Sequence, residues 1–520
     1  MTHWLSQVSS RLWSAARRRV GIDLRALVAF RIGLAGVLLL DLALRVRSLG
    51  AFYTDNGVLP RAALLADYVQ PYSVHLLTGS ARGQALLFVV HGGCALALLV
   101  GYRNRLAAVG AWLLTYSLHA RNPMILNSGD TLLGLLLLWA MFLPLDRRQI
   151  TDELSSLEGQ SWVVTPATAA VLVQVWLVYG LNSVHKLRGS AWLAGDAVEQ
   201  VFGLGQFTVL LGPTVSELSG LLSVATYLWL GLLVASPLLL LSAGWIRAIV
   251  ATLLIGGHLG MLLTMQLGVF PLVSITGLVL FYPPFVWDRL SDWLVPPWQS
   301  SRRDGRLDWL SQPESLILGG GLTSFPLRGW LPTESRAAAA FRGWAQITWV
   351  RVLPVVLLVG MLLSAGYATT ENSTPEPAAE IIGTVGIDQS WRMFAPNPLS
   401  TEVWYVAPGV VTNGSTVDVY HAGTDGPRGG AVKYARPARV DTTYGSARWR
   451  KYLENVRTVD NENHRSYYAD YLCGRWNRTQ ATDVRQVAVY GVRQPARPEG
   501  TVSPSKQLLT IHDCSGGLIQ

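Results

Sequence analysis

The chain has 520 residues, of which 50% are hydrophobic and 14% are charged, and its formal net charge is +9. Soluble domains carry about 25% charged residues, so this composition excludes an ordinary soluble protein and indicates that lipid is the main solvent. The positive charge does not indicate nucleic-acid binding. The basic residues lie between long apolar runs rather than on one soluble face, as arginines at membrane boundaries do.

Residues 1–26 form a basic N-terminal segment with five arginines among tryptophans and leucines. Such a segment is typical of a helix that lies in the cytoplasmic interface of a membrane. It lacks a short apolar core followed by a small-residue cleavage site, so we expect no cleavable signal peptide.

Nine apolar runs follow the basic segment. They cover roughly residues 27–47, 84–101, 106–119, 130–145, 167–184, 221–243, 246–266, 268–285 and 350–367. A helix that spans a bilayer needs about 20 residues, so the runs predict an all-α polytopic bundle of about nine spans, two of them short. We assign residues 27–290 to this bundle, 291–349 to a cytoplasmic linker rich in Gly, Pro, Ser and Arg, and 350–367 to the last span.

Arginine placement predicts the orientation of the bundle. With a cytoplasmic N-terminus, the connections that hold Arg103, Arg247 and the arginines of the 291–349 linker are also cytoplasmic, as the positive-inside rule requires. Nine spans then place the C-terminal region outside a cell membrane. The N-x-S/T acceptors that agree with this, because they follow the last span, are Asn372, Asn413 and Asn477.

Residues 372–520 have a different pattern from the bundle. VWYVAPGVV, STVDVYHAG, RQVAVYGV and KQLLTIHDC alternate as strands do, and ARWRKYLENVR and ENHRSYYADYLCGRW look helical. We therefore expect a small extracytoplasmic α+β domain. Cys473 and Cys514 both fall in it and could form a disulfide if the domain is exported, whereas no CxxC motif or His/Cys cluster indicates a metal site.

Polar side chains inside the apolar runs are candidates for function, since burying them in lipid is costly. Arg31 and Asp41 share the first run but are about 15 Å apart along a helix, so each needs a partner other than the other. His258 is flanked by glycines, which let a helix or a ligand approach closely. The alternative for each is an ordinary ion pair or hydrogen bond between helices.

Two polar segments lie at the boundaries of the bundle. Asp55 begins a D-N-G turn signal in FYTDNGVLPR, which indicates either part of a site or a plain outer loop. Asn127, Ser128 and Asp130 stand where a helix enters the bilayer. Ser128 or Asp130 is expected to cap that helix, with or without a role in binding a ligand.

The segment NSVHKLRGSAWLAGDAV, residues 182–198, combines polar groups with the end of an apolar run. Asn182, His185 and Lys186 end the run, and Trp192 follows in a short interfacial helix. A lysine partly buried in an apolar wall has its neutral form favoured and can act as a general base. The alternative is a lysine that reaches the outer headgroups and only anchors the span.

Several of these segments, in this order, resemble a known family. RIGLAGVLLLDL, FYTDNGVLPR, LNSGDTLLGLLLLWAMFLPLD, NSVHKLRGSAWLAGDAV and GGHLGMLLTMQLGVFP look like the HTTM domain. That is the transmembrane domain shared by vitamin K-dependent γ-carboxylase and many prokaryotic membrane proteins. The likeness covers roughly residues 20–290, and WRMFAPNPLS, residues 391–400, resembles a segment that follows this domain in many bacterial and archaeal members.

The resemblance implies a chemistry for Lys186. In the carboxylase a lysine in a K-L-x-x-x-W-x-x-G context deprotonates reduced vitamin K, and HKLRGSAWLAG places Lys186 at that position. This implies a pocket for reduced vitamin K or menaquinol, with Lys186 as base and with His185 and Asn182 positioning it or the substrate. The other ligand-binding candidates are Arg31, Asp55, Asn127, Ser128, Asp130, Trp192 and His258.

Two departures from the carboxylase keep other functions open. A histidine of its N-N-H-S-Y segment falls on Gly129 or a neighbour here, and its large lumenal region has no clear counterpart. The first hypothesis is a lipid-quinol enzyme, carboxylase-like or epoxidase-like, that modifies an extracytoplasmic peptide or protein. The alternatives are a non-catalytic transporter or a factor for maturation and assembly of exported proteins, and a membrane platform for a structural or signalling outer domain.

Overall fold

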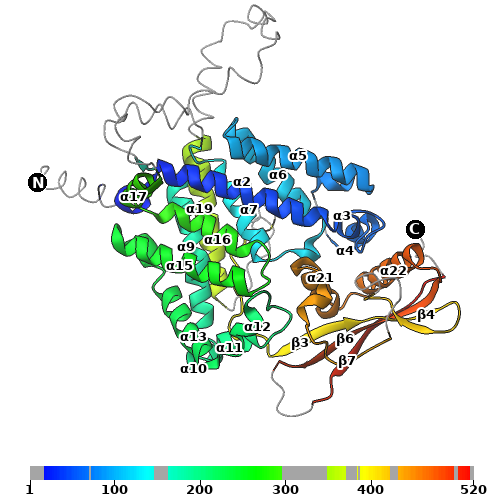
Figure 1. Cartoon of the computed structure of the whole chain (residues 1–520). Coiled ribbons are helices and arrows are strands. Elements are labelled where there is room, and N and C mark those ends of the chain that lie inside the picture. Colours follow the sequence, from blue (N-terminus) through cyan, green and yellow to red (C-terminus); the bar gives the residue numbers. More distant parts are fainter. Residues whose placement is uncertain are drawn as a thin grey trace, which may run out of the picture.

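A computed structural model of the chain describes residues 14, 17–68, 72–145, 162–294, 348–370, 383, 387–421, 431–496 and 502–515. Most of the N-terminal segment and of the predicted 291–349 linker lie outside these residues, as does Asn372. The described chain consists of a large helical part followed by a smaller domain that contains a β-sheet (Figure 1).

Five helices of the described chain are long and apolar enough to cross a membrane. They are α2 (Leu24–Val46), α5 (Ala81–Val100), α9 (Pro166–Lys186), α15 (Trp245–Thr264) and the continuous pair η7 (Thr348–Val352) and α19 (Leu353–Thr369). A sixth candidate is the bent pair formed by α16 with η3 (Phe270–Phe281) and by α17 (Pro284–Leu294), whose axes meet at 107°. The chain is therefore a multi-pass membrane protein.

The remaining predicted spans are helices that are shorter or more polar. These are α6 (Asn104–Arg121), α7 (Ser128–Ala140) and α13 (Ser219–Val234), the last continued by α14 (Leu238–Leu241). Each of the nine predicted apolar runs thus coincides with a helix. Helix length and composition support five or six spans, and a count of nine requires α6, α7 and α13 to cross as well.

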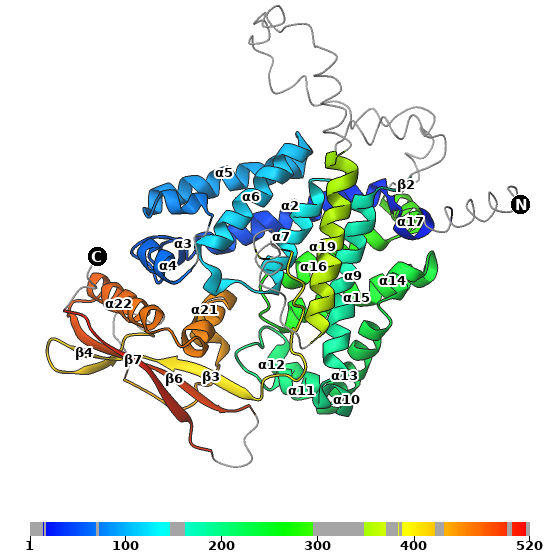
Figure 2. The ribbon, with the colours of Figure 1, turned by 180° about the vertical axis from the view of Figure 1, so that it is seen from behind.

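Short elements join these helices. β1 (Ile22–Asp23) and β2 (Trp162–Val163) pair antiparallel just before α2 and α9. The other connecting helices are α3 (Leu49–Tyr53), α4 (Arg61–Asp67), η1 (Val74–Leu77), η2 (Pro123–Ile125), α10 (Ser190–Ala194), α11 (Ala197–Phe202) and α12 (Gly212–Val215). α19 packs on α9 of the bundle (Figure 2). This contact fixes the position from which the chain continues toward the C-terminal domain.

The C-terminal domain is built on a five-stranded antiparallel sheet. Its strands are β3 (Thr401–Val406), β4 (Pro408–Val411), β5 (Thr416–Asp418), β6 (Val484–Pro495) and β7 (Ser505–Asp513). The long strand β6 pairs with β3 and β4 along one edge and with β7 along the other. The helical elements are η8 (Asp441–Tyr444), α21 (Ala447–Thr458) and α22 (Glu462–Thr479). The predicted α+β domain is confirmed.

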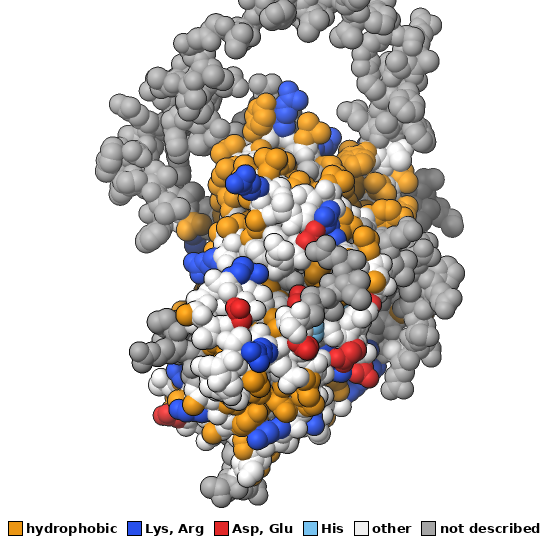
Figure 3. All heavy atoms as spheres, turned by 90° about the vertical axis from the view of Figure 1, so that its right-hand side faces the viewer, with side chains coloured by type: hydrophobic (Ala, Val, Ile, Leu, Met, Phe, Trp, Pro, Cys, Tyr) orange, Lys and Arg blue, Asp and Glu red, His pale blue; other side chains and the backbone are white. Residues whose placement is uncertain are grey.

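Two helices of the domain lie between its sheet and the membrane helices, as both ribbon views show (Figures 1 and 2). α21 contacts η2 of the bundle, and α22 contacts α4 as well as β6 and β7. The surface differs between the two parts. Figure 3 shows hydrophobic side chains gathered over the helical part, where Leu86, Val89 and Val90 of α5 are exposed, and more charged side chains below.

Candidate functional site

Lys186 is the last residue of α9 and is enclosed by protein, with 2% of its surface exposed. Its Nζ donates a hydrogen bond to the main-chain carbonyl of Met393 over 3.1 Å and lies 3.4 Å from the centroid of the Trp192 ring. Among the described residues it forms no ion pair with a carboxylate. The segment that covers Lys186, residues 387–397, is here called the strap.

Two further donors beside Lys186 bind main-chain carbonyls of the strap. The Asn182 amide, one helical turn before Lys186, donates to the carbonyls of Trp391 and Met393 over 2.9 and 3.2 Å. The Trp192 indole, in α10, donates to the carbonyl of Phe394 over 2.9 Å. The structure therefore brings together three of the predicted site residues, and each of them bonds to the strap.

The strap also lies against the turn between α9 and α10. The main-chain N–H of Ala191 donates to Oδ1 of Asn397 over 3.0 Å. A Cβ on Gly189 would come within 1.7 Å of the carbonyl oxygen of Pro396, so only glycine lets the strap approach this closely. The glycine that marks a turn in the sequence therefore has a packing role.

Gln389 anchors the beginning of the strap in the bundle and is fully buried. Its side-chain amide exchanges two hydrogen bonds with the Gln174 amide of α9, over 2.9 and 3.0 Å. Its main-chain N–H donates to the Ser364 hydroxyl of α19, and its Oε1 accepts from the Trp391 indole over 2.7 Å. The anchor is thus separate from the three donors around Lys186.

His185 does not join Lys186 in this cluster. Successive residues of a helix are about 100° apart, so its ring leaves α9 in another direction. The ring is buried, and its Nε2 has no hydrogen-bond partner among the described residues. The structure thus gives no contact through which His185 positions Lys186.

A second polar cluster lies between the bundle and the C-terminal domain. Arg45 of α2 donates to Asp41 over 2.6 Å, to the Tyr53 hydroxyl over 2.7 Å and to Asp130 over 2.5 Å. Arg448 of α21 reaches in from the domain and pairs with both Asp41 and Asp130. Two buried carboxylates therefore face two arginines, and one of these belongs to the other part of the chain.

Arg448 remains charged in this cluster. Burial and the nearby Arg45 lower its pKa, but Asp130 and Asp41 outweigh them and raise the pKa above its usual value. Its guanidinium also contacts the carbonyl of Ile125 over 3.5 Å. The sequence predicted that Asp41 pairs with a residue other than Arg31, and the structure confirms this. Its partners are Arg45 and Arg448, which the sequence pattern did not single out.

The cap of α7 differs from the expectation. The side chain of Asn127, not Ser128, accepts the N–H of Gly129, and Asp130 accepts the main-chain N–H of Asn127, which completes a capping box. The expectation for Ser128 was wrong because the helix begins at Ser128 itself, one residue earlier than a Ser128 cap requires. Asp130 combines this local bond with its ion pairs to Arg45 and Arg448.

Arg31 and Asp55 lie apart from both clusters. The Arg31 guanidinium is 3.5 Å from the carbonyl of Leu145. Asp55 pairs with Arg61 over 2.7 Å at the edge of a loop, as the plain-loop alternative describes. Neither residue is brought to Lys186.

His258 is held among aromatic side chains inside the bundle. Its Nε2 shares a hydrogen bond with the Tyr179 hydroxyl over 2.9 Å, and its ring lies edge-on to Trp229 and Phe270. Tyr179 lies two turns before Lys186 on α9. The geometry matches the alternative of a hydrogen-bond partner between helices.

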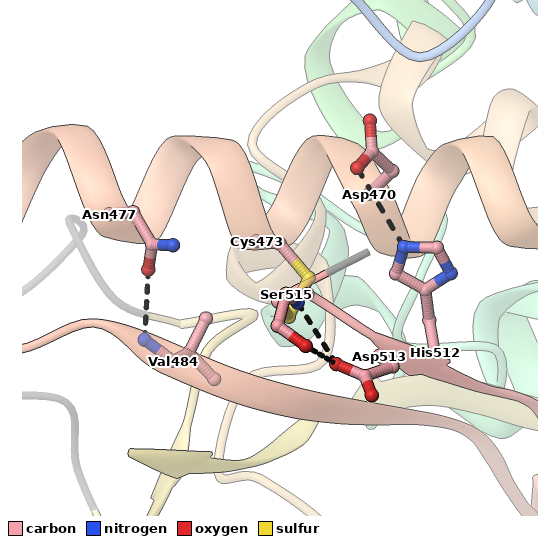
Figure 4. The surroundings of a disulfide bond; sticks show 8 residues. Asp470, Cys473, Asn477, Val484, His512, Asp513 and Ser515 are labelled. Carbon is pink, nitrogen blue, oxygen red and sulfur yellow. Dashed lines mark hydrogen bonds and ion pairs between the residues drawn. A yellow bond between two sulfur atoms is a disulfide. The ribbon is translucent and has the colours of Figure 1, made fainter. Parts of the chain in front are cut away.

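Cys473 and Cys514 are joined by a disulfide in the structure, with an S–S distance of 2.02 Å. The bond links α22 to the end of β7, next to the His512 and Asp470 side chains (Figure 4). Among the described residues no group of three or more His, Cys, Asp or Glu side chains could hold a metal ion.

Comparison with protein families matches the HTTM domain over residues 21–287, which is about half of the chain. The chain belongs to the HTTM domain family. This domain is the one shared with vitamin K-dependent γ-carboxylase. Comparison with curated proteins and with solved structures finds no match.

Both polar clusters of this HTTM protein cross the boundary of the HTTM domain. Asn182, Lys186 and Trp192 lie within the matched residues, whereas the strap that they bind follows them. Asp41 and Asp130 likewise belong to the domain, and Arg448 does not. The residues that complete each cluster are supplied by the C-terminal part of the chain.

Proposed function

We propose that this HTTM protein is a lipid-quinol-dependent membrane enzyme that modifies an extracytoplasmic peptide or protein, with Lys186 as its base. The observation that carries the proposal is a lysine enclosed at the end of a spanning helix without a carboxylate partner among the described residues. Ionisable groups at such positions are costly and are usually kept for function.

The donors around Lys186 fit the polar head of a quinol. Lys186, Asn182 and Trp192 each donate to a carbonyl oxygen in the structure, and the oxygens of a quinone or quinol accept hydrogen bonds in the same way. When bound, reduced vitamin K or menaquinol would supply the reducing power that, with oxygen, drives removal of a proton from the substrate. Asn182 and Trp192 would orient the head, and the Lys186 amine would accept its hydroxyl proton.

We further propose nine spans, a cytoplasmic N-terminus and an extracytoplasmic C-terminal domain. Arg25 bonds to Asp288 and Arg247 bonds to the carbonyl of Arg19, so basic residues gather where α2, α15 and α17 begin. This is the end of α2 opposite Arg45, which faces the C-terminal domain. Helix ends that carry arginines usually face the cytoplasm, whereas a disulfide usually forms in an oxidising compartment outside it.

Cysteine labelling tests this orientation. In a Cys94→Ser background, we expect Ser415→Cys in the exposed turn of the domain to react with a membrane-impermeant maleimide in intact cells. Tyr102→Cys, in the loop between α5 and α6, should react only after the membrane is permeabilised. The reverse result would invert the proposed orientation, and labelling of both residues in intact cells would rule out the proposed span count.

A second candidate function is a non-catalytic factor for the maturation or assembly of exported proteins. The contacts of Lys186 favour it, since a carbonyl oxygen at 3.1 Å and an aromatic ring at 3.4 Å are also what a purely structural ammonium binds. In that case Lys186 only fastens the strap, and the C-terminal domain presents its surface to a partner.

Quinol turnover distinguishes the two candidates. Purified protein in lipid is given reduced vitamin K or menaquinol with oxygen and bicarbonate, and epoxide is followed by chromatography. We expect Lys186→Ala to lower the rate by about 10²–10⁴-fold, as loss of a general base does, while Lys451→Ala on the domain surface leaves it unchanged. A folded wild-type protein that forms no epoxide from either quinol would favour the maturation factor.

A further inference from the structure

The strap bonds to each of the three donor side chains that the proposed quinol site offers. Lys186, Asn182 and Trp192 together hold the carbonyls of three strap residues, 391, 393 and 394. We propose that the strap is an internal ligand of the Lys186 site, and that a lipid quinone or quinol binds there only when the strap has left. This proposal rests on the function proposed above and adds to it the regulation of the same site.

Mutual exclusion follows from the geometry of the donors. The Lys186 Nζ lies between the Met393 carbonyl and the face of the Trp192 ring, and the Trp192 indole N–H has the Phe394 carbonyl as its partner. An indole has a single N–H, so a second acceptor cannot bind it while Phe394 does. Both N–H groups of the Asn182 amide are likewise bonded to the strap, so a quinone oxygen that bonds to Trp192 or Asn182 must take the place of a strap carbonyl.

The middle of the strap is suited to leave. Residues 392–397 form no helix or strand, and Arg392 and Asn397 are exposed, whereas Trp391 is buried beside Gln389. Phe394 has φ +53°, a conformation that costs a non-glycine residue energy and that its contacts must maintain. Gln389, in contrast, is buried and bonded to two helices, so it sets how firmly the strap is held.

Release of the strap would also affect the C-terminal domain, to which the strap is directly connected. β3 begins four residues after Asn397, and Glu402 of β3 accepts the main-chain N–H of Gly205 over 2.7 Å. Glu402 is paired in turn with Arg436 of the domain. The strap thus joins the quinol site to the part of the chain that we propose presents the substrate.

Two variants test the competition without using turnover. Gln389→Ala removes the side-chain bonds of the anchor to Gln174 and Trp391 but leaves all three donors, so we expect it to bind menaquinone about tenfold more tightly because the competent state is more populated. Gln84→Ala is the matched control, since Gln84 is an equally buried glutamine that is bonded to His75 in another part of the bundle. Binding is measured with oxidised menaquinone in lipid nanodiscs.

Hydrogen exchange on the wild-type protein provides the second readout. Saturating menaquinone should speed exchange in residues 387–397 and leave the α22 amides unchanged. Menaquinone that binds without altering strap exchange, equal affinities of Gln389→Ala and Gln84→Ala, or no binding by any of the three proteins would each overturn the competition. If binding and exchange behave as expected but no epoxide forms, the proposed enzyme activity fails and the competition stands.

Discussion

Arg448→Ala is expected to destabilise the chain by about 3–5 kcal/mol, the usual effect of removing one partner from a buried ion pair. The native cluster balances Asp41 and Asp130 against Arg45 and Arg448, and the carboxylates have at most 3% of their side chains exposed. Without Arg448, two buried negative charges share the one remaining arginine of this cluster. The loss should appear in thermal unfolding and in faster proteolysis of the C-terminal domain.

A second substitution that restores the charge balance of the cluster should partly rescue the stability of Arg448→Ala. Asp41→Asn in the Arg448→Ala background restores a neutral cluster, so the double variant should recover part of the lost stability. Arg478→Ala, at an exposed position of α22, is the control and should change stability by less than about 0.5 kcal/mol. Equal stability of Arg448→Ala and Arg478→Ala would show that the cluster does not hold the domain.

The cluster joins the two parts of the chain by buried ion pairs. Arg448 comes from outside the HTTM domain, yet it neutralises charges that lie inside it. Asn455 of the same helix donates to the Met124 carbonyl in η2, and Tyr452 donates to the Val58 carbonyl. The surface of α21 that faces the bundle therefore satisfies backbone groups of the bundle as well as its carboxylates.

The helices and strands were predictable because their signals are local. An apolar run or an alternating segment carries its own pattern, and so α2, α9, β6 and β7 lie where the sequence places them. The choice of Asn127 over Ser128 as the cap was not predictable, because it depends on a one-residue difference in where α7 begins. The number of spans was not predictable from the apolar runs either, because α7 and α13 are shorter than a bilayer requires.

The sequence predicted the residues that the HTTM domain contributes to the candidate site, but not the strap carbonyls that they bind. Asn182, Lys186 and Trp192 are close in sequence, so helical spacing and the family pattern indicated them together. Their partners lie about 200 residues away, and no local pattern says that the carbonyls of WRMFAPN bind them. Arg45 had a usable signal, an acidic residue four positions earlier, whereas Arg448 looks like any other arginine of a surface helix.

Removal of the disulfide is the second change for which we expect a large loss of stability. The bond closes a segment of 41 residues between Cys473 and Cys514, and constraint of the unfolded chain over that length contributes about 4 kcal/mol. The segment contains the end of α22, β6 and β7, so the sheet and the helix that covers it should lose stability together. We expect Cys473→Ser with Cys514→Ser to lower the thermal midpoint of the C-terminal domain and to speed hydrogen exchange in β7.

Reductant provides the matched comparison for this variant. A reducing agent should lower the midpoint of the wild-type domain to that of the double variant and leave the double variant unchanged, because both treatments remove the same constraint. Cys94→Ser, which changes the free cysteine of α5 in the bundle, should leave the domain as stable as the wild type. A wild-type midpoint that does not respond to reductant would mean that the two thiols are not joined in the mature protein. It would also remove one argument for an extracytoplasmic domain, and the arrangement of arginines would then be the main support for that orientation.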